Sequence, residues 1–229
     1  MNRNSSVVVW AIVAVIIGGI GGYFIGKSGS SSTAQIASST PMPASNTAYS
    51  NKAVDFNKAM RQLWEDHITW TRLYIVEAAS GNPGASQTAA RLLKNQEDIG
   101  SAIKPYYGDA AGEQLTTLLK SHIQGAVDIL TAAKTNNQTK LATAKTAWYD
   151  NANQIADFLA QANPTSWPQA TMRAHMKEHL DLTLQEGVDE LGGKYVESIA
   201  DYDKVHPQIL SLADTLSAGI ASQFPDKFK

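Results

Sequence analysis

Four of the five histidines lie on the apolar faces of four different predicted helices: His67, His122, His179 and His206. Apolar residues flank each of them at spacings of three and four, which is the period of a helix face turned toward a core. Imidazole nitrogens ligate zinc, copper and iron, and helical bundles build metal sites from inward-facing histidine and carboxylate side chains. The four histidines are therefore candidate ligands of a transition metal, namely zinc, copper or iron.

The connections between the predicted helices place these histidines at one height. Each lies about 12 residues, or roughly 18 Å, from the same end of an up-and-down bundle. The same count along the two remaining helices reaches two pairs of adjacent polar residues, Gln96 with Glu97 and Asp150 with Asn151. Carboxylates bind a metal directly or orient the imidazoles that do so. We therefore expect Glu97 and Asp150 to belong to the metal site or to lie beside it.

A buried hydrogen-bond network is the alternative interpretation of this layer. In that case the histidines, the amide side chains and the tryptophan N–H groups satisfy one another without a metal. A third interpretation rests on "HMKEH", residues 175–179, which has the form of the inverted zinc-peptidase motif with its glutamate as general base. His175 lies off the buried stripe, and five residues without structural context are a weak match.

The sequence from residue 51 onward predicts helices joined by short connections. Each connection contains proline, glycine or asparagine, which are typical of helix ends. No segment there alternates apolar and polar residues as a half-buried strand would. Short connections favour antiparallel neighbours, so the predicted fold class is an all-α, antiparallel up-and-down bundle. Six helices are expected, near residues 51–79, 84–103, 110–133, 138–162, 168–191 and 194–222.

Residues 1–27 predict one N-terminal transmembrane helix that anchors the chain. The stretch 7–26 is uncharged and as a helix would be about 30 Å long, the thickness of a bilayer core. A cleaved signal peptide is the competing interpretation, but it would have a shorter apolar region and a clear cleavage site. Arg3 and the amino terminus favour an N-terminus inside the cell. We therefore expect a single-pass protein of the cell membrane, with most of the chain outside the cytoplasm.

Small residues recur every four positions within this anchor, at Ala14, Gly18, Gly22 and Gly26. Such a stripe lets transmembrane helices approach closely, which predicts a homo-oligomer formed through the anchor. Residues 28–50 are rich in serine and threonine and contain proline. They are expected to form a flexible linker to a helical bundle domain at residues 51–229.

The composition excludes several kinds of site. The chain has no cysteine, which excludes disulfides, thiolate metal sites and cysteine nucleophiles. The net charge is −2 and no basic stripe with interleaved aromatic residues occurs, so no nucleic-acid partner is expected. The sequence also lacks a phosphate-binding loop, a nucleotide fingerprint and a nucleophile elbow. It therefore leaves open whether the protein is an enzyme.

Several segments between about residue 60 and residue 228 resemble, in the same order, a family of bacterial helical-bundle proteins. These segments are "LWEDHITWTR", "RLLKNQEDIGSAIKPYYG", "LLKSHI", "WYDNANQIADFL", "EHLDLT" and "QFPDKF". Members of this family carry conflicting names, kinase and glycosyltransferase, and neither name has a supporting motif in this chain. His175 departs from the family pattern. The resemblance implies that the pattern includes His67, His122, His179, Glu97, Asp98, Trp148 and Asn151.

Together these features predict a membrane-anchored, extracytoplasmic bundle that binds a transition metal or a small ligand in a buried histidine layer. The alternative is a non-catalytic interaction or assembly module, in which the polar layer only sets the register of the helices. Both interpretations require that the imidazoles converge inside the bundle.

Overall fold

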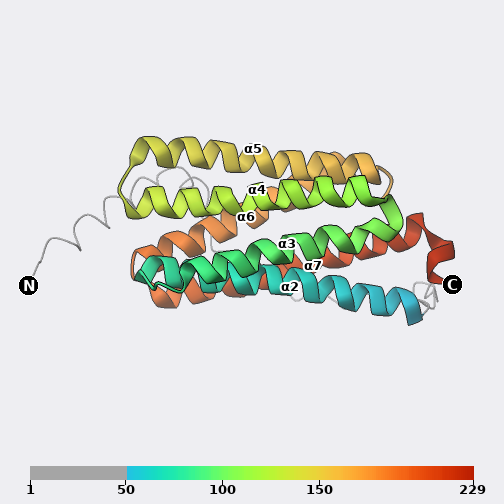
Figure 1. Ribbon diagram of the computed structural model, residues 1–229, viewed down its shortest axis with the longest axis horizontal. Helices are drawn as coiled ribbons and strands as arrows, with labels where there is room; N and C mark the ends of the chain where they lie inside the picture. Colours follow the sequence, from blue (N-terminus) through green and yellow to red (C-terminus); the bar gives the residue numbers. More distant parts are fainter. Residues whose placement is uncertain (1–50) are drawn as a thin grey trace, which may run out of the picture.

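The computed structural model describes residues 51–229, which form six α-helices and one short 3-10 helix (Figure 1). No strand occurs within this range, which confirms the predicted all-α class. The elements are α2 (Asn51–Ser80), α3 (Ala85–Tyr107), α4 (Asp109–Lys134), α5 (Gln138–Ala162), α6 (Gln169–Leu191), α7 (Tyr195–Gln223) and η1 (Pro225–Phe228).

The predicted anchor at residues 7–26 and the linker at residues 28–50 lie outside the described residues. The same is true of the small-residue stripe at Ala14, Gly18, Gly22 and Gly26. None of the helices between residues 51 and 229 is both long and apolar enough to cross a membrane.

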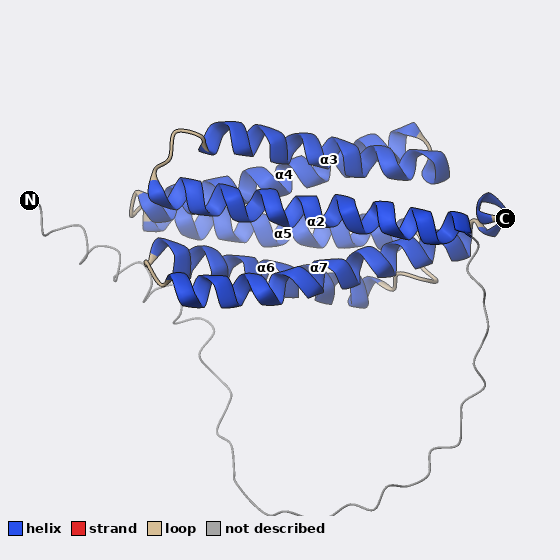
Figure 2. Ribbon diagram, turned by 90° about the horizontal axis from the view of Figure 1, so that it is seen from below, coloured by secondary structure: helices blue, strands red, loops and turns tan. Residues whose placement is uncertain are grey.

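The six helices form a closed ring. α2, α3 and α7 lie side by side in one layer, and α4, α5 and α6 form a second layer behind it (Figure 2). Each helix packs against the next one along the chain, and α7 returns to α2. α2 also contacts α4 and α6 across the two layers. These three helices run in the same direction (Figure 1) and bring their inward faces together at the centre of the bundle.

α3 extends beyond its predicted end at residue 103. It continues through Pro105 to Tyr107, and Gly108 makes the turn into α4 with a φ of 85°. The prediction of an earlier end was wrong because a proline in the last turn removes a single backbone hydrogen bond and leaves the preceding turns intact. The positive φ explains why glycine follows the helix.

α3 and α4 approach each other closely at two glycines. A Cβ atom on Gly100 would lie 2.5 Å from the carbonyl oxygen of Gly112 and 1.9 Å from Thr116 Oγ1. A Cβ atom on Gly112 would lie 2.6 Å from the carbonyl oxygen of Gly100. Only residues without a Cβ allow this separation. The contact holds α3 against α4 one turn after Gln96, a residue that faces the centre of the bundle.

Gly100→Ala should lower the free energy of unfolding by about 1–3 kcal/mol, because the added methyl group overpacks the contact between α3 and α4. Gly187→Ala in α6 is the matched control, since its Cβ would meet the nearest Leu130 methyl group at an ordinary 3.4 Å. Alanine is also the better helix former, so the control should not lose stability. Urea denaturation measures both changes. If Gly100→Ala were as stable as the parent chain, α3 and α4 would not be in such close contact at Gly100.

Candidate histidine site

Three buried histidines from three helices meet at the centre of the bundle. His67 on α2, His122 on α4 and His179 on α6 are each no more than 3% exposed. The ring centroids of His67 and His122 are 6.5 Å apart. The ring of His179 lies 5.8 Å from that of His67 and 6.1 Å from that of His122. The three imidazoles therefore form one cluster, which we call the histidine cluster.

His206 lies away from this cluster, contrary to the prediction. Its side chain is 37% exposed, and its Nε2 is 3.1 Å from Glu65 Oε1. The buried face of α7 instead includes Gln208, two residues further along. The apolar stripe that suggested His206 also contains Tyr195 and Ile199, which are 62% and 55% exposed. The N-terminal half of this stripe is thus exposed to solvent, whereas its continuation at Ile209, Ala213 and Leu216 is buried.

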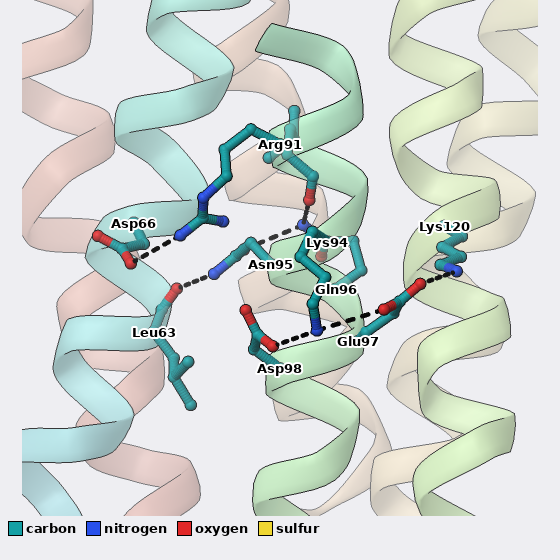
Figure 3. Close-up of polar contacts among 10 residues, drawn as sticks. Leu63, Asp66, Arg91, Lys94, Asn95, Gln96, Glu97, Asp98 and Lys120 are labelled. Carbon is teal, nitrogen blue, oxygen red and sulfur yellow. Dashed lines mark hydrogen bonds and ion pairs between the residues drawn. The ribbon is translucent and has the colours of Figure 1, made fainter. Parts of the chain in front are cut away.

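The two predicted carboxylates also point away from the histidine cluster. Glu97 pairs with Lys120 at 2.6 Å on the outer side of α3 and α4 (Figure 3), and Asp150 is exposed. Their neighbours Gln96 and Asn151 are buried. Adjacent residues are rotated by about 100° around a helix axis, so only one member of each pair faces the core. Both pairs lie at the predicted height in the bundle. In each pair, the residue that faces the core is the amide and not the predicted carboxylate.

Gln96 holds the imidazole of His67 through Nδ1. Its Nε2 lies 3.2 Å from His67 Nδ1 and also donates to the carbonyl of Leu92 at 2.9 Å and to Asn95 Oδ1 at 3.0 Å, so three acceptors share its two hydrogens. Since Nε2 is the donor of the amide, His67 Nδ1 accepts, and the neutral ring carries its proton on Nε2.

Asn151 holds His122 in the opposite tautomer. Its Nδ2 donates to the carbonyl of Leu118 at 3.1 Å, which turns Oδ1 toward His122 Nδ1 at 3.2 Å. His122 Nδ1 therefore donates, and its Nε2 keeps a lone pair. Trp148 stacks on the same ring at 5.3 Å between centroids, and its Nε1 donates to the His122 carbonyl at 2.9 Å.

Burial keeps all three imidazoles neutral at pH 7. It is the largest cause of the low pKa of each ring, about 3 for His122, about 4 for His179 and well below 6.5 for His67. Repulsion between the rings lowers the pKa of His67 and His122 further. Hydrogen bonds to the amide side chains oppose these shifts only in part. The neutral form is the one that binds a metal ion.

Several buried polar atoms around the histidine cluster have no hydrogen-bond partner. They are Trp64 Nε1, Gln96 Oε1, His179 Nδ1, Thr183 Oγ1 and Gln208 Oε1. Gln208 raises the pKa of His179 somewhat, yet neither Gln208 Oε1 nor His179 Nδ1 reaches normal hydrogen-bond geometry. An unpaired buried group costs about 1–3 kcal/mol. Their concentration around the rings leaves hydrogen-bonding capacity that a buried water or a bound ligand would satisfy.

A buried ion-pair network further along α2 and α6 was not predicted. Arg72 donates to Glu186 Oε1 and Glu190 Oε2, each at 3.1 Å, and to Ser198 Oγ at 2.5 Å. Burial raises the pKa of Glu186 to about 7, and the charge of Arg72 opposes this shift. The sequence feature that could have predicted this network is the pair Glu186 and Glu190, which lie one helical turn apart on the face of α6 that continues from His179.

The "HMKEH" motif does not bring its residues to one place. His179 is buried, whereas Glu178 is exposed and His175 is only half-buried. The backbone carbonyl of His175 accepts from Gln208 Nε2 at 3.0 Å. The geometry therefore gives no support to a zinc-peptidase site.

The histidine cluster is slightly wider than a bound metal requires. Imidazoles with nitrogens about 2.0 Å from one zinc ion have ring centroids roughly 5 Å apart, so each ring here would move inward by roughly 0.5 Å. In their present positions, no three His, Asp or Glu side chains within residues 51–229 are arranged to hold a metal ion. No protein-family model, curated protein or solved structure matches the chain.

The histidine cluster should make the bundle less stable as the pH falls below about 6.5. The pKa values of the folded state lie below 6.5, so the unfolded state binds more protons. Stability then falls by about 1.4 kcal/mol per pH unit for each histidine. Between about pH 6 and pH 5, protonation of folded Glu186 offsets one of these three protons. The net slope should be roughly 2.7 kcal/mol per pH unit.

Urea denaturation at pH 7, 6 and 5 measures this slope. His179→Gln should reduce it by about one proton, or roughly 1.4 kcal/mol per pH unit. His206→Gln removes an exposed histidine and is the matched control. If His179→Gln and the parent chain had the same slope, His179 would not be held neutral by the fold.

Proposed function

We propose that the bundle binds one divalent transition-metal ion between His67, His122 and His179, with zinc, copper and iron as the candidates. The supporting observation is the meeting of three neutral imidazoles from three separate helices, all within 6.5 Å between ring centroids. Neutral imidazole is the commonest metal ligand, and bundles form such sites between facing helices. Glu97, Asp150 and His206 are left out of the ligand set because they face outward.

Metal ligation through Nε2 requires a change of tautomer at His67 but not at His122. His122 already presents a lone pair on Nε2 because its Nδ1 donates to Asn151. His67 carries its proton on Nε2 while Gln96 donates to Nδ1. Rotation of the Gln96 amide would bring its unpartnered Oε1 to Nδ1 and leave Nε2 of His67 available to the metal, at the cost of the hydrogen bonds from Gln96 Nε2 to the Leu92 carbonyl and to Asn95 Oδ1. Such a contact also raises the basicity of the ligand.

Three histidines leave one coordination position open. Zinc sites with three protein ligands complete a tetrahedron with water or with an exogenous molecule. Gln208 Oε1 is buried beside His179 without a partner, and it is the candidate acceptor for a hydrogen bond from such a water. The proposal concerns metal binding and assigns no reaction.

A non-catalytic interaction or assembly module with a structural polar layer is the second candidate. The observation in its favour is that Gln96 and Asn151 bond to helix carbonyls as well as to the rings. The contact of Gln96 with His67 sets the rotation of α3 against α2, and the contacts of Asn151 with His122 and the Leu118 carbonyl set that of α5 against α4. Under this alternative, water supplies the missing partners of the histidine cluster.

Metal titration of the full-length chain separates the two candidates. After chelator treatment, calorimetry with zinc should show one ion per chain. His67→Ala, His122→Ala and His179→Ala should each weaken binding by at least about 100-fold, the upper end of what loss of a supporting group costs. His206→Ala is the matched control and should bind as the parent does. A folded chain that takes up no zinc, copper or iron would exclude the metal site.

The same titration tests the role of Gln96. Gln96→Glu should strengthen zinc binding by about 10-fold, because a carboxylate accepts from His67 Nδ1 and imposes the ligating tautomer. Gln96→Leu removes that support and should weaken binding by a similar factor. If the layer is only structural, the two variants will change stability and leave metal content at zero.

We also propose that residues 7–26 anchor the bundle in the cell membrane and that the bundle lies outside the cytoplasm. The support is the apolar length of this segment and the positive charge of Arg3. The stripe of small residues supports self-association of the anchor through Ala14, Gly18, Gly22 and Gly26.

Protease added to intact cells should remove the bundle, and the mature chain should keep its apolar N-terminal segment. Mass spectrometry of the purified protein and immunoblotting of treated cells measure these two outcomes. A mature N-terminus beyond residues 7–26 would refute the anchor, and a protease-resistant bundle in intact cells would refute the orientation.

A further inference from the structure

An apolar cavity of about 40 Å³ adjoins the histidine cluster, toward the C-terminal ends of α2, α4 and α6. Each of these helices contributes a wall residue one turn after its histidine, namely Thr71, Ala126 and Thr183. The next turn of each contributes Ile75, Leu130 and Gly187. Because the three helices run in the same direction (Figure 1), the cavity continues from the histidine layer along the axis of the bundle.

The walls of this cavity have few groups that can form hydrogen bonds to water. The Thr71 hydroxyl donates to the His67 carbonyl at 2.7 Å, and Trp148 Nε1 donates to the His122 carbonyl at 2.9 Å. The remaining lining is aliphatic except for Tyr74 and Thr183, whose Oγ1 has no hydrogen-bond partner. A buried water needs two to four polar partners, whereas an apolar cavity stays dry and accepts apolar guests.

A second pocket of about 150 Å³ opens at the same end of the bundle. It is lined by the last turns of α2 and α4 and by the end of α6. Its walls share Tyr74, Leu130 and Leu191 with the apolar cavity. These three side chains therefore stand between the surface pocket and the interior, and their rotation would connect the two.

We propose that the apolar cavity is a binding site for a small apolar molecule of diatomic size, such as dioxygen, which enters from the surface pocket past Tyr74, Leu130 and Leu191. The volume sets the size of the guest. An engineered cavity of about 150 Å³ accepts benzene or xenon, so 40 Å³ suits a guest of a few heavy atoms. The site does not depend on a bound metal, although it would place its guest one helical turn from the proposed ligands.

Xenon and dioxygen are the probes, and the full-length chain is used after chelator treatment so that the outcome is independent of the metal proposal. Xenon should cause saturable shifts of the methyl resonances of Ile75, Ile123, Leu130 and Val188. Dissolved dioxygen is paramagnetic and should relax the same methyl protons more than those elsewhere in the core. Shifts that do not saturate, or relaxation spread evenly over the core, would overturn the proposal.

Filling the cavity should abolish the effect without unfolding the bundle. Gly187→Ala adds one methyl group at ordinary contact distance, and Ala126→Leu adds a larger side chain. Each should weaken xenon binding at least about 10-fold because the space is occupied. Ala147→Leu, on an exposed face of α5, is the matched control. Unchanged affinity in a cooperatively folded Gly187→Ala chain would refute the site.

The entrance is tested separately. Leu191→Ala should speed the exchange of xenon by at least about 10-fold, since it removes one of the side chains between the pocket and the cavity. If Leu191→Ala exchanged xenon at the rate of the parent chain, xenon would not enter past Leu191. The binding site itself is tested by Gly187→Ala and Ala126→Leu.

Discussion

The neutral state of three packed imidazoles is the condition on which the centre of this bundle depends. A charged ring there would meet both desolvation and the neighbouring histidines, so all three remain uncharged. Neutral rings still need partners for their nitrogens, and amide side chains supply them at His67 and His122. Gln96 and Asn151 are in turn held by helix carbonyls. The hydrogen bonds to the two rings therefore set the rotation of α3 relative to α2 and of α5 relative to α4.

Small residues allow the helices to come close enough for these contacts. The backbones of α3 and α4 nearly touch at Gly100 and Gly112. On the other side of α4, a Cβ atom on Gly125 would lie 2.6 Å from the Trp148 ring. The same indole stacks on His122, so the position of this imidazole depends on the absence of a side chain at Gly125. The polar centre and the glycines of the interfaces are parts of one arrangement.

The interior changes character along the bundle axis. The histidine cluster lies at one level of the bundle. The apolar cavity begins one helical turn further toward the C-terminal ends of α2, α4 and α6. The interior between α2 and α6 also holds charged groups, and these are paired, Arg72 with Glu186 and Glu190. Under the two proposals, a metal at the histidine cluster and a small apolar molecule in the cavity would lie about one helical turn apart.

The period of the apolar residues by itself determined the all-α class, the approximate helices and the inward positions of His67, His122 and His179. A spacing of three and four places residues on one face, whatever that face contacts. It could not show that the first half of the apolar stripe on α7 is left uncovered while the second half is buried, so His206 was misplaced. It placed Glu97 and Asp150 one position off their apolar stripes, but it carries no information on which polar side chains the imidazoles meet. Only the packing of neighbouring helices decided which side chains meet the imidazoles, and these are amides because burying an amide with partners is less costly than burying an unpaired carboxylate.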